Sequence, residues 1–588
     1  MYTTLTKRSL YALLIFTAVL FFSCQKEFSI DNGSIDQSTD LVTKVSSSVS
    51  GFVTDDNNAA VMGATVQFGT STITTDKYGY FEAKNVQVVK TAAVVTVIKP
   101  GYFKGIKTYI AAEGKAAFFR IKLIPKTNVG NINGTSGGAV TLANGLSIVL
   151  PAGAVVNAAT NSAYTGTVNI AASWIDPVAA DLNSIMPGDL RGTDKDGALK
   201  LLQTFGMAAV ELTGASGELL QVAAGKKATL TLSIPASLVS SAPASIPLWY
   251  FDEAKGLWKE EGSATKTGNS YTGEVNHFSF WNYDVPGNYV QFDCILKDIA
   301  GNPVPFALVQ ITVTATNSSG WGYTDGSGHV GGAVPNNEQL LLEVFPSFNC
   351  GAPVYTQSFT TTTVNISLGV ITITNNLMAT VSGTVTDCSN NPVTNGYILI
   401  SEGNYYSRYS LSNTGTFSFV TLLCTNNFPV TIIAQDMTAL QTSNPLPYSL
   451  QYGSNAIGNI TACGSQIPEF VNYTINGVSH ALSAPPDNIS ETGYNPNNIY
   501  ISAWGANSFA GIGYDRPNPP NTLGNLTGFM SSYLNDSLTV INPIPVNITE
   551  FGNIGQYVSG NFSGTMTSML NPSVTYTITC NFRTKRNF

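Results

Sequence analysis

The sequence predicts an all-β, multidomain chain, a string of antiparallel β-sandwiches. Short runs in which apolar and polar residues alternate are separated by turns rich in Gly, Asn, Asp and Pro, the pattern of half-buried strands. Of the 588 residues, 43% are hydrophobic, 11% are charged and 54 are glycine. Such a composition suits several small β cores covered by neutral polar residues, and the length is enough for about four or five domains.

The first 23 residues are expected to be a signal peptide. Lys7 and Arg8 precede an apolar run from Leu10 to Phe22, which is shorter than the roughly 20 residues of a membrane-spanning helix. Ser23 and Cys24 follow directly, and a small residue before a Cys at this point resembles the lipobox of bacterial lipoproteins. The resemblance implies that Cys24 is lipidated and anchors the chain in a membrane. The alternative is an ordinary secretory signal.

Residues 24–45 are expected to form a tether, because they are rich in Ser, Thr and Asp and poor in aromatic residues. The short charged patch Gln25-Lys26-Glu27 resembles the surface-export signal of Bacteroidota-type lipoproteins, although it also suits a solvated tether. The resemblance implies an outer-membrane location with exposure at the cell surface. The net charge of −8 and the pI near 5.0 argue against nucleic acid as a partner.

An order of strand, turn, strand and turn recurs in three segments, residues 46–126, 287–370 and 371–463. In each segment an Asp or Asn turn ends the first strand, and a second such turn with a Gly feeds a later strand. The recurrence predicts repeated domains of one fold. The paired turns are Asp55 and Asp76, Asp298 and Asp325, and Asp387 and Asn413.

The first of these segments resembles the carboxypeptidase regulatory-like domain, a transthyretin-like β-sandwich. The resemblance rests on Gly51-Phe52-Val53-Thr54-Asp55, Gly63-Ala64-Thr65-Val66, Thr75-Asp76 with Gly79-Tyr80-Phe81, and Pro100-Gly101-Tyr102. The third segment matches well at its start, and the second only at its turns. The resemblance implies a fold without peptidase activity, because in that family the catalytic zinc lies in a different domain. We therefore expect no metal, no cofactor and no catalytic residue.

Residues 127–286 resemble the zona-occludens/Unc-five-type β-sandwich and are similar to the extracellular region of cartilage intermediate layer protein. The supporting residues are Gly137-Gly138, Pro151-Ala152-Gly153-Ala154 and His277-Phe278-Ser279. Some members of the first family cleave themselves between the Phe and the Ser. The resemblance implies that the Ser279 hydroxyl would attack the carbonyl of Phe278 while His277 moves the proton. We favour the competing interpretation, a packed core strand leading into Phe280-Trp281. Residues 464–588 alternate strongly and predict one more antiparallel sandwich.

Seven cysteines are present, and assigning Cys24 to lipid leaves six, which could form up to three disulfides in an oxidising compartment. Their pairing is open. The spacing lacks a C-x-x-C pair, so a zinc site is not expected. These six are Cys294, Cys350, Cys388, Cys424, Cys463 and Cys580.

Two groups of aromatic residues are candidates for ligand binding. Tyr405, Tyr406 and Tyr409 surround Arg408 and could stack on sugar rings, or could form a cross-strand ladder that stabilises a sheet. Trp504 lies among Asn, Gly and Pro loops of the last segment. We expect the C-terminal half to make the external contacts if the domains extend from the anchor; folding back of the domains on one another is the alternative.

These observations together predict a non-enzymatic, lipid-anchored protein of the cell envelope that serves surface adhesion or acts as a scaffold. One alternative is a carbohydrate- or protein-binding component of an outer-membrane nutrient uptake system. Another is a protein that cleaves itself at Phe278-Ser279. The expected partners are the membrane, through the lipid, and an extracellular glycan or protein whose identity the sequence does not reveal.

Overall fold

The computed structural model describes residues 40–587, apart from 347–350, 375–376, 440, 465–468, 485–486, 496–497, 506–507, 516–522, 535–536, 541 and 552–556. The expected signal peptide, Cys24 and most of the expected tether lie outside the described residues. Within them the chain is built from strands, with one short helix, α2 (Leu182–Ile185). The prediction of an all-β, multidomain chain is confirmed. Among the described helices, none has the length and apolarity to cross a membrane.

The first unit (residues 40–126) consists of two sheets, ordered β4-β1-β7 and β3-β2-β5-β6, around an apolar core. Alternation explains the strands: in β5, Ala93, Val95 and Val97 are buried while the residues between them are half-exposed. β1 begins inside the expected tether. The strands are β1 (Lys44–Thr54), β2 (Thr65–Phe68), β3 (Ser71–Thr74), β4 (Tyr80–Val89), β5 (Ala93–Ile98), β6 (Gly105–Tyr109) and β7 (Lys115–Lys122).

The third and fourth units (residues 288–374 and 377–464) repeat this strand order, with sheets β24-β21-β27 and β23-β22-β25-β26, then β31-β28-β35 and β30-β29-β32-β33 with β34 beside β32. The third unit holds β21 (Tyr289–Lys297), β22 (Leu308–Val313), β23 (Ser319–Tyr323), β24 (His329–Pro335), β25 (Gln339–Phe345), β26 (Tyr355–Thr360) and β27 (Ile366–Thr372). The fourth holds β28 (Met378–Thr386), β29 (Gly396–Glu402), β30 (Tyr405–Ser410), β31 (Thr416–Leu422), β32 (Phe428–Asp436), β33 (Gln441–Thr442), β34 (Leu446–Leu450) and β35 (Gly453–Thr461).

The recurring Asp residues close the turn after the first strand of each repeat. Asp55, Asp298 and Asp387 each accept, through one carboxylate oxygen, the backbone N–H groups two and four residues later. Asp76 and Asp325 do the same at the second turn. In the fourth unit the hydroxyl of Ser412, rather than Asn413, takes this role. At these turns the backbone N–H groups donate to a short side chain, because no neighbouring strand is present to accept their hydrogen bonds.

A glycine is required at the second turn of each repeat. Gly79, Gly328 and Gly415 have φ of 75°, 79° and 74°. A Cβ at these positions would meet the carbonyl oxygen of a first-strand residue at 2.2, 2.4 and 2.8 Å, respectively. The turn therefore passes too close to the first strand for any side chain.

The second unit (residues 127–287) forms a sheet of 13 strands around a large apolar core. Its strands are β8 (Asn128–Asn133), β9 (Gly138–Thr141), β10 (Ser147–Leu150), β11 (Val155–Asn157), β12 (Thr167–Ile175), β13 (Arg191–Thr193), β14 (Leu199–Thr213), β15 (Leu219–Val222), β16 (Ala228–Ser233), β17 (Ser245–Asp252), β18 (Leu257–Thr267), β19 (Ser270–Val275) and β20 (Phe280–Gly287).

The fifth unit (residues 469–587) is an antiparallel sheet of 10 strands that closes on its own core. Its strands are β36 (Glu469–Ile475), β37 (Val478–Ala484), β38 (Asn488–Asn495), β39 (Asn498–Trp504), β40 (Phe509–Asp515), β41 (Leu523–Ser531), β42 (Ser537–Thr539), β43 (Pro545–Phe551), β44 (Tyr557–Ser568) and β45 (Thr575–Lys585).

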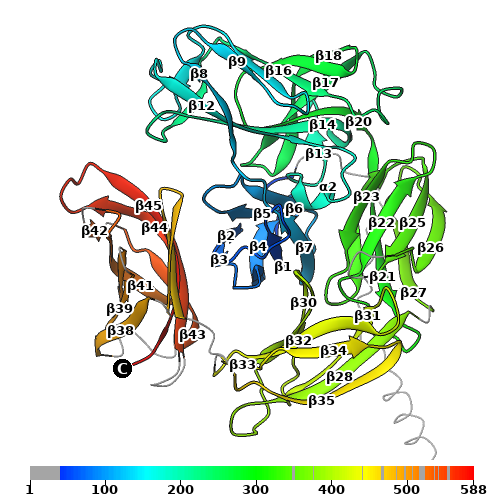
Figure 1. Ribbon diagram of the computed structural model, residues 1–588, viewed down its shortest axis with the longest axis vertical. Helices are drawn as coiled ribbons and strands as arrows, with labels where there is room; N and C mark the ends of the chain where they lie inside the picture. Colours follow the sequence, from blue (N-terminus) through cyan, green and yellow to red (C-terminus); the bar gives the residue numbers. More distant parts are fainter. Residues whose placement is uncertain are drawn as a thin grey trace, which may run out of the picture.

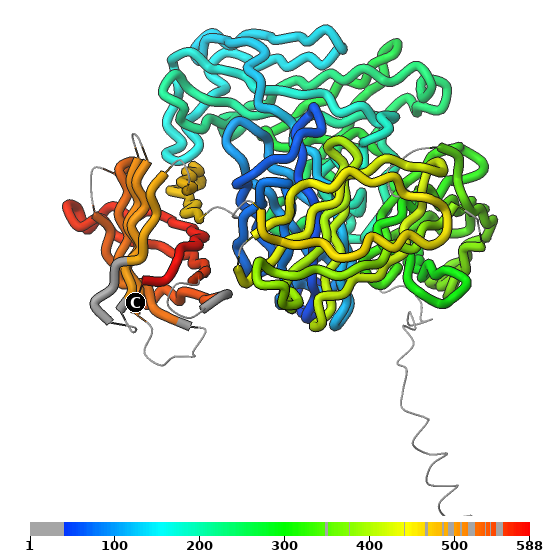
Figure 2. The backbone as a smooth tube through the Cα atoms, turned by 60° about the horizontal axis from the view of Figure 1, so that its bottom comes forward, coloured from blue at the N-terminus to red at the C-terminus, as the bar shows by residue number. Residues whose placement is uncertain are grey.

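The units do not extend in a line. In Figure 1 the first unit lies in the middle, with the second above it, the third to the right, the fourth below and the fifth to the left. Side-chain contacts agree with this arrangement: the first unit packs against the third through Phe118 and Phe306, and against the fourth through Arg120 and Tyr406. Figure 2 shows the fifth unit standing to one side of the other four. The fifth unit also touches the first, because Asn472 Nδ2 donates to Thr74 Oγ1 at 3.5 Å and β44 and β45 lie against β3. Of the two sequence-based alternatives, the chain therefore follows the folded-back one.

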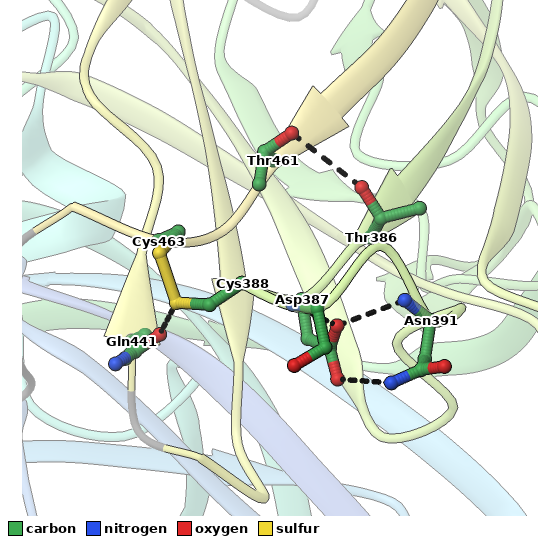
Figure 3. Close-up of a disulfide and its surroundings, with 8 residues drawn as sticks. Thr386, Asp387, Cys388, Asn391, Gln441, Thr461 and Cys463 are labelled. Atoms are coloured by element: carbon green, nitrogen blue, oxygen red, sulfur yellow. Dashed lines mark hydrogen bonds between the residues drawn. A yellow bond between two sulfur atoms is a disulfide. The ribbon is translucent and has the colours of Figure 1, made fainter.

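Cys388 and Cys463 form a disulfide between residues 75 apart in sequence (Figure 3). The disulfide joins the loop after β28 to the residues that follow β35, and so links the carboxyl ends of the fourth unit's first and last strands. Cys424 is also disulfide-bonded. Cys350 lies outside the described residues.

The expectation that all six non-lipid cysteines could pair is wrong for two of them. Cys294 and Cys580 are free thiols. Each is buried among apolar side chains in a different core, that of the third and of the fifth unit. Burial raises the pKa of the Cys294 thiol to about 12 and that of Cys580 well above its usual range, so both remain unreactive thiols.

Candidate ligand-binding surface

The His277-Phe278-Ser279 segment lies in the bend between β19 and β20, not in a core strand as the sequence suggested. Phe278 is buried, and the amide of Gln221 holds its backbone on both sides, accepting from its N–H at 2.7 Å and donating to its carbonyl at 3.1 Å. The Gln221 side chain thus makes the two backbone hydrogen bonds that a neighbouring strand would otherwise make to Phe278.

The groups of this segment are not arranged for proton transfer. The Ser279 hydroxyl donates to the carbonyl of Phe280 at 3.1 Å. The His277 ring packs between Tyr250 and Trp281, with ring centroids 4.7 and 5.1 Å away. Burial lowers the pKa of His277 below its usual value. A general base must reach the proton that it removes, and His277 is held by aromatic neighbours instead.

Tyr405, Tyr406 and Tyr409 lie in a junction between the first, third and fourth units. The guanidinium of Arg120 lies 3.5 Å from the centre of the Tyr405 ring, and its Nη2 donates to the carbonyl of Tyr406 at 2.9 Å. Burial raises the pKa of Tyr409 to about 12 and that of Tyr405 well above its usual range. These rings are engaged by other parts of the chain, so they do not form an open platform for sugars.

Exposed apolar side chains gather instead at one end of the fifth unit. They come from the β39–β40, β41–β42 and β44–β45 turns, which the antiparallel order brings to the same end. Leu570 is 78% exposed, Met569 63%, and Trp504 and Tyr533 56% each. We call this surface the apolar tip; it comprises Trp504, Phe509, Met530, Tyr533, Leu534, Met569 and Leu570.

The apolar tip surrounds a shallow hollow of about 530 Å³, lined by apolar side chains and by serine hydroxyls. The lining residues are Phe509, Met530, Ser531, Ser532, Leu534, Ser537, Met569 and Leu570. In Figure 1, β42 lies at the outer left of the fifth unit, away from the other units. The hollow therefore opens toward the surroundings of the molecule.

Hydrogen bonds between the turns hold the tip in shape. The N–H of Phe509 donates to Ser532 Oγ at 2.9 Å, and the N–H of Ser532 donates back to the carbonyl of Phe509 at 3.0 Å. The N–H of Met569 donates to the carbonyl of Ser537 at 2.9 Å. Each turn is thus tied to its neighbour, and the apolar side chains are presented on a preformed surface.

Two ring pairs support the exposed aromatic residues. Trp504 packs against Phe509 with centroids 4.1 Å apart, and Tyr533 stacks on His480 at 3.8 Å. Burial lowers the pKa of His480, which favours the neutral imidazole under the Tyr533 ring. The described residues of the three turns (504–505, 508–509, 530–534, 537 and 568–574) include no Asp, Glu, Lys or Arg. Asp536, which belongs to the β41–β42 turn in the sequence, lies outside the described residues.

The described part of the chain contains no group of three or more His, Cys, Asp or Glu that could hold a metal ion. Of the members of the apolar tip, sequence analysis found only Trp504. The signal that could have found the rest is the presence of Met, Leu and Tyr inside turns, as in Ser568-Met569-Leu570-Asn571-Pro572, where polar residues are the rule.

The chain is similar in part to curated proteins. A segment of 126 residues, 21% of this chain, is 33% identical to human cartilage intermediate layer protein 2, and 106 residues are 35% identical to the mouse protein. These matches span only 10% and 9% of the relatives' lengths. No protein-family model matches the chain.

Solved structures with a likeness to parts of the chain include the shaft pilin SpaA of Lactobacillus rhamnosus GG, 8% identical with a TM-score of 0.18. That match covers 31% of this chain and 99% of the pilin. A streptococcal ancillary pilin is 10% identical with a TM-score of 0.14, over 40% of this chain and 98% of the pilin. At such TM-scores no conclusion follows from the likeness.

Proposed function

We propose that this chain is a non-enzymatic protein of the cell envelope, anchored by lipid on Cys24, whose first four units form a base and whose fifth unit binds an extracellular partner. The observation that carries the proposal is the apolar tip. Exposed apolar surface gathered in one place is costly to keep in water and commonly marks a site of interaction. The location at the outer membrane and the cell surface rests on the sequence signals around Cys24.

The composition of the tip favours a protein partner. Aromatic residues and Met are enriched in protein interfaces, while charged residues are depleted at their centres. Met569 and Leu570 extend furthest into solvent and offer flexible aliphatic contact, which suits an apolar side chain of a partner entering the hollow. Adhesion or scaffolding at the cell surface follows from such a contact.

A glycan is the second candidate, because Trp504 and Tyr533 expose aromatic rings on which a sugar face could stack. In that case the chain would suit a binding component of an outer-membrane nutrient uptake system. A transporter encoded beside it would favour this reading over adhesion.

The test uses residues 25–588 with Met569→Ser and Leu570→Ser, compared with the unchanged chain and with Ile299→Ser. Ile299 is 77% exposed in the third unit, so it controls for the loss of an exposed apolar side chain elsewhere. Coated beads are applied to arrays of extracellular proteins and of glycans. We expect the double variant to lose at least tenfold in binding to a protein target, the equivalent of about 1.4 kcal/mol, while the control binds as before. Equal binding by all three chains would refute the proposal. Binding to glycans alone, lost in Trp504→Ala, would establish the second candidate.

A further inference from the structure

The first and fourth units lie against each other although the second and third units separate them in sequence. The expected anchor leads into β1 of the first unit, and the fifth unit follows β35 of the fourth. Between them, residues 127–374 form the second and third units. The first and fourth units nevertheless touch directly, at β7 and β30 (Figure 1). The first four units thus form a ring that is closed by noncovalent contacts between the first and the fourth unit.

Arg120 forms the centre of this contact from the side of the first unit. Its guanidinium lies 3.5 Å from the Tyr405 ring centre and also contacts the ring of Tyr323, 5.5 Å away in the third unit. The hydrogen bond from Arg120 to the Tyr406 carbonyl fixes its plane. A cation held over aromatic rings away from water makes an interaction that separation of the units would have to break.

Arg408 makes the reciprocal contact from the side of the fourth unit. Its guanidinium lies 3.2 Å from the centre of Tyr397 in its own unit and 4.0 Å from that of Tyr80 in the first. Asp76 of the first unit lies near enough to interact with it electrostatically. Tyr78 also packs on Tyr406, with centroids 5.3 Å apart. Two arginines, one from each unit, therefore cross the same interface.

A strained residue stands at the edge of the contact. Phe306 of the third unit has a φ of 60°, a left-handed backbone conformation that is strained for a bulky residue. Its ring lies between Phe118 of the first unit and Tyr409 of the fourth, at 4.6 and 5.5 Å. The packing of the three units over-determines this conformation, which indicates a tightly specified junction.

The strands that lead to the contact are suited to bear tension. β1 is hydrogen-bonded on both sides, antiparallel to β4 and parallel to β7, and Phe52 pairs with Arg120 itself. A force that pulls on the start of β1 would act on all of its hydrogen bonds to β4 and β7 at once, and these bonds would not break one after another. At the exit of the fourth unit, the Cys388–Cys463 disulfide prevents β35 from peeling away from β28 (Figure 3).

We propose that this junction is a mechanical clamp: when the fourth unit is pulled away from the N-terminal anchor, the Arg120 and Arg408 contacts carry tension between β7 and β30, together with the contacts that join the first unit to the second and third. This inference rests on the proposed function in one respect, namely that the tension arises when the lipid holds one end of the chain and a bound partner pulls on the fifth unit. The clamp itself is a property of the Arg120 and Arg408 contacts.

The test is single-molecule stretching of residues 25–588 held by handles at both ends. The unchanged chain should show a first force peak before any unit unfolds, when the clamp opens and the units of the base separate from one another. The variant carrying Arg120→Ala and Arg408→Ala should show that peak at a clearly lower force, and its radius of gyration in X-ray scattering should rise. Lys259→Ala is the control, because Lys259 lies over Tyr250 at 5.8 Å within the second unit alone, and its trace should match that of the unchanged chain.

If the double variant does not fold, Arg120→Lys keeps the charge but removes the planar guanidinium, and it should lower the force of the first peak. A first peak that is absent from the unchanged chain, or that is equal in force in the arginine variants, would overturn the clamp. The variant with Met569→Ser and Leu570→Ser tests the proposed function separately. It should lose binding to the partner but keep the first force peak.

Discussion

At the scale of single residues, one side chain of the first unit determines the surroundings of the fourth unit's tyrosines, because the guanidinium of Arg120 lies 3.5 Å from the centre of the Tyr405 ring. Tyr405, Tyr406 and Tyr409 were singled out with Arg408, yet their partner Arg120 lies 285 or more residues away along the chain. Alternation shows that side chains of a strand face opposite sides; it does not show which side another domain covers. The same limit applies to Ser279, whose hydroxyl direction depends on the bend that Gln221 creates.

Lys107 provides a pH-dependent prediction. The side chain is 3% exposed, and its Nζ donates to the carbonyls of Asn183 and Met186, across the contact between the first and second units. Burial lowers its pKa from 10.5 to about 7, although Asp189 opposes the shift. Between pH 7 and 10.5 the unfolded chain therefore binds a proton that the folded chain lacks, so this residue's contribution to stability rises with pH over that range.

The measurement is urea unfolding of the unchanged chain and of Lys107→Met at pH 7, 8 and 9. The difference in free energy of unfolding between the two chains should move in favour of the unchanged chain by on the order of 1 kcal/mol or more per pH unit. The contributions of other titrating groups cancel in this difference, because both chains contain those groups. A difference that stays constant with pH would show that Lys107 keeps its charge in the folded protein.

Ser279 provides a second prediction at this scale. Because His277 is held between aromatic rings and the Ser279 hydroxyl is bonded to the Phe280 carbonyl, the chain should remain uncut at Phe278. Denaturing electrophoresis of the purified protein should show one band. Two fragments that are absent in Ser279→Ala would instead establish self-cleavage.

At the scale of strands and turns, the sequence was most informative. Alternation predicted strands in the three repeated segments and in residues 464–588, and the structure has strands there, among them β1, β5 and β45. The turns were predictable because Asp and Gly satisfy local requirements of hydrogen bonding and φ. The apolar tip was missed for the opposite reason: Met569 and Leu570 break the local rule that turns are polar, and only the neighbouring turns show that they belong together.

The Cys388–Cys463 disulfide leads to a prediction about the fourth unit. It closes a loop of 75 residues, and crosslinks of this span typically contribute about 2–4 kcal/mol by restricting the unfolded chain. The double substitution Cys388→Ser and Cys463→Ser should lower the unfolding temperature of the transition that involves the fourth unit. Calorimetry of both chains measures it. An unchanged transition would mean that strand packing alone determines the stability of this unit.

At the scale of the whole molecule, the sequence predicted the fold class but not the arrangement. The repeated strand order of the first, third and fourth units follows from local patterns. Their packing around the first unit depends on contacts between residues hundreds of positions apart, for which single-sequence patterns carry no signal. The result is a compact base with the fifth unit at one side (Figure 2), where the apolar tip is free to meet a partner.

The most direct test of the account compares cells that display the full chain with cells that display a chain ending at Gly464, the last described residue before the fifth unit. Surface amount is matched by antibody labelling of the base, and adhesion to the target found on the arrays is then counted under flow. The account predicts that the truncated chain stays anchored and folded but loses adhesion, as does the full chain with Met569→Ser and Leu570→Ser. Adhesion by the truncated chain equal to that of the full chain would contradict it.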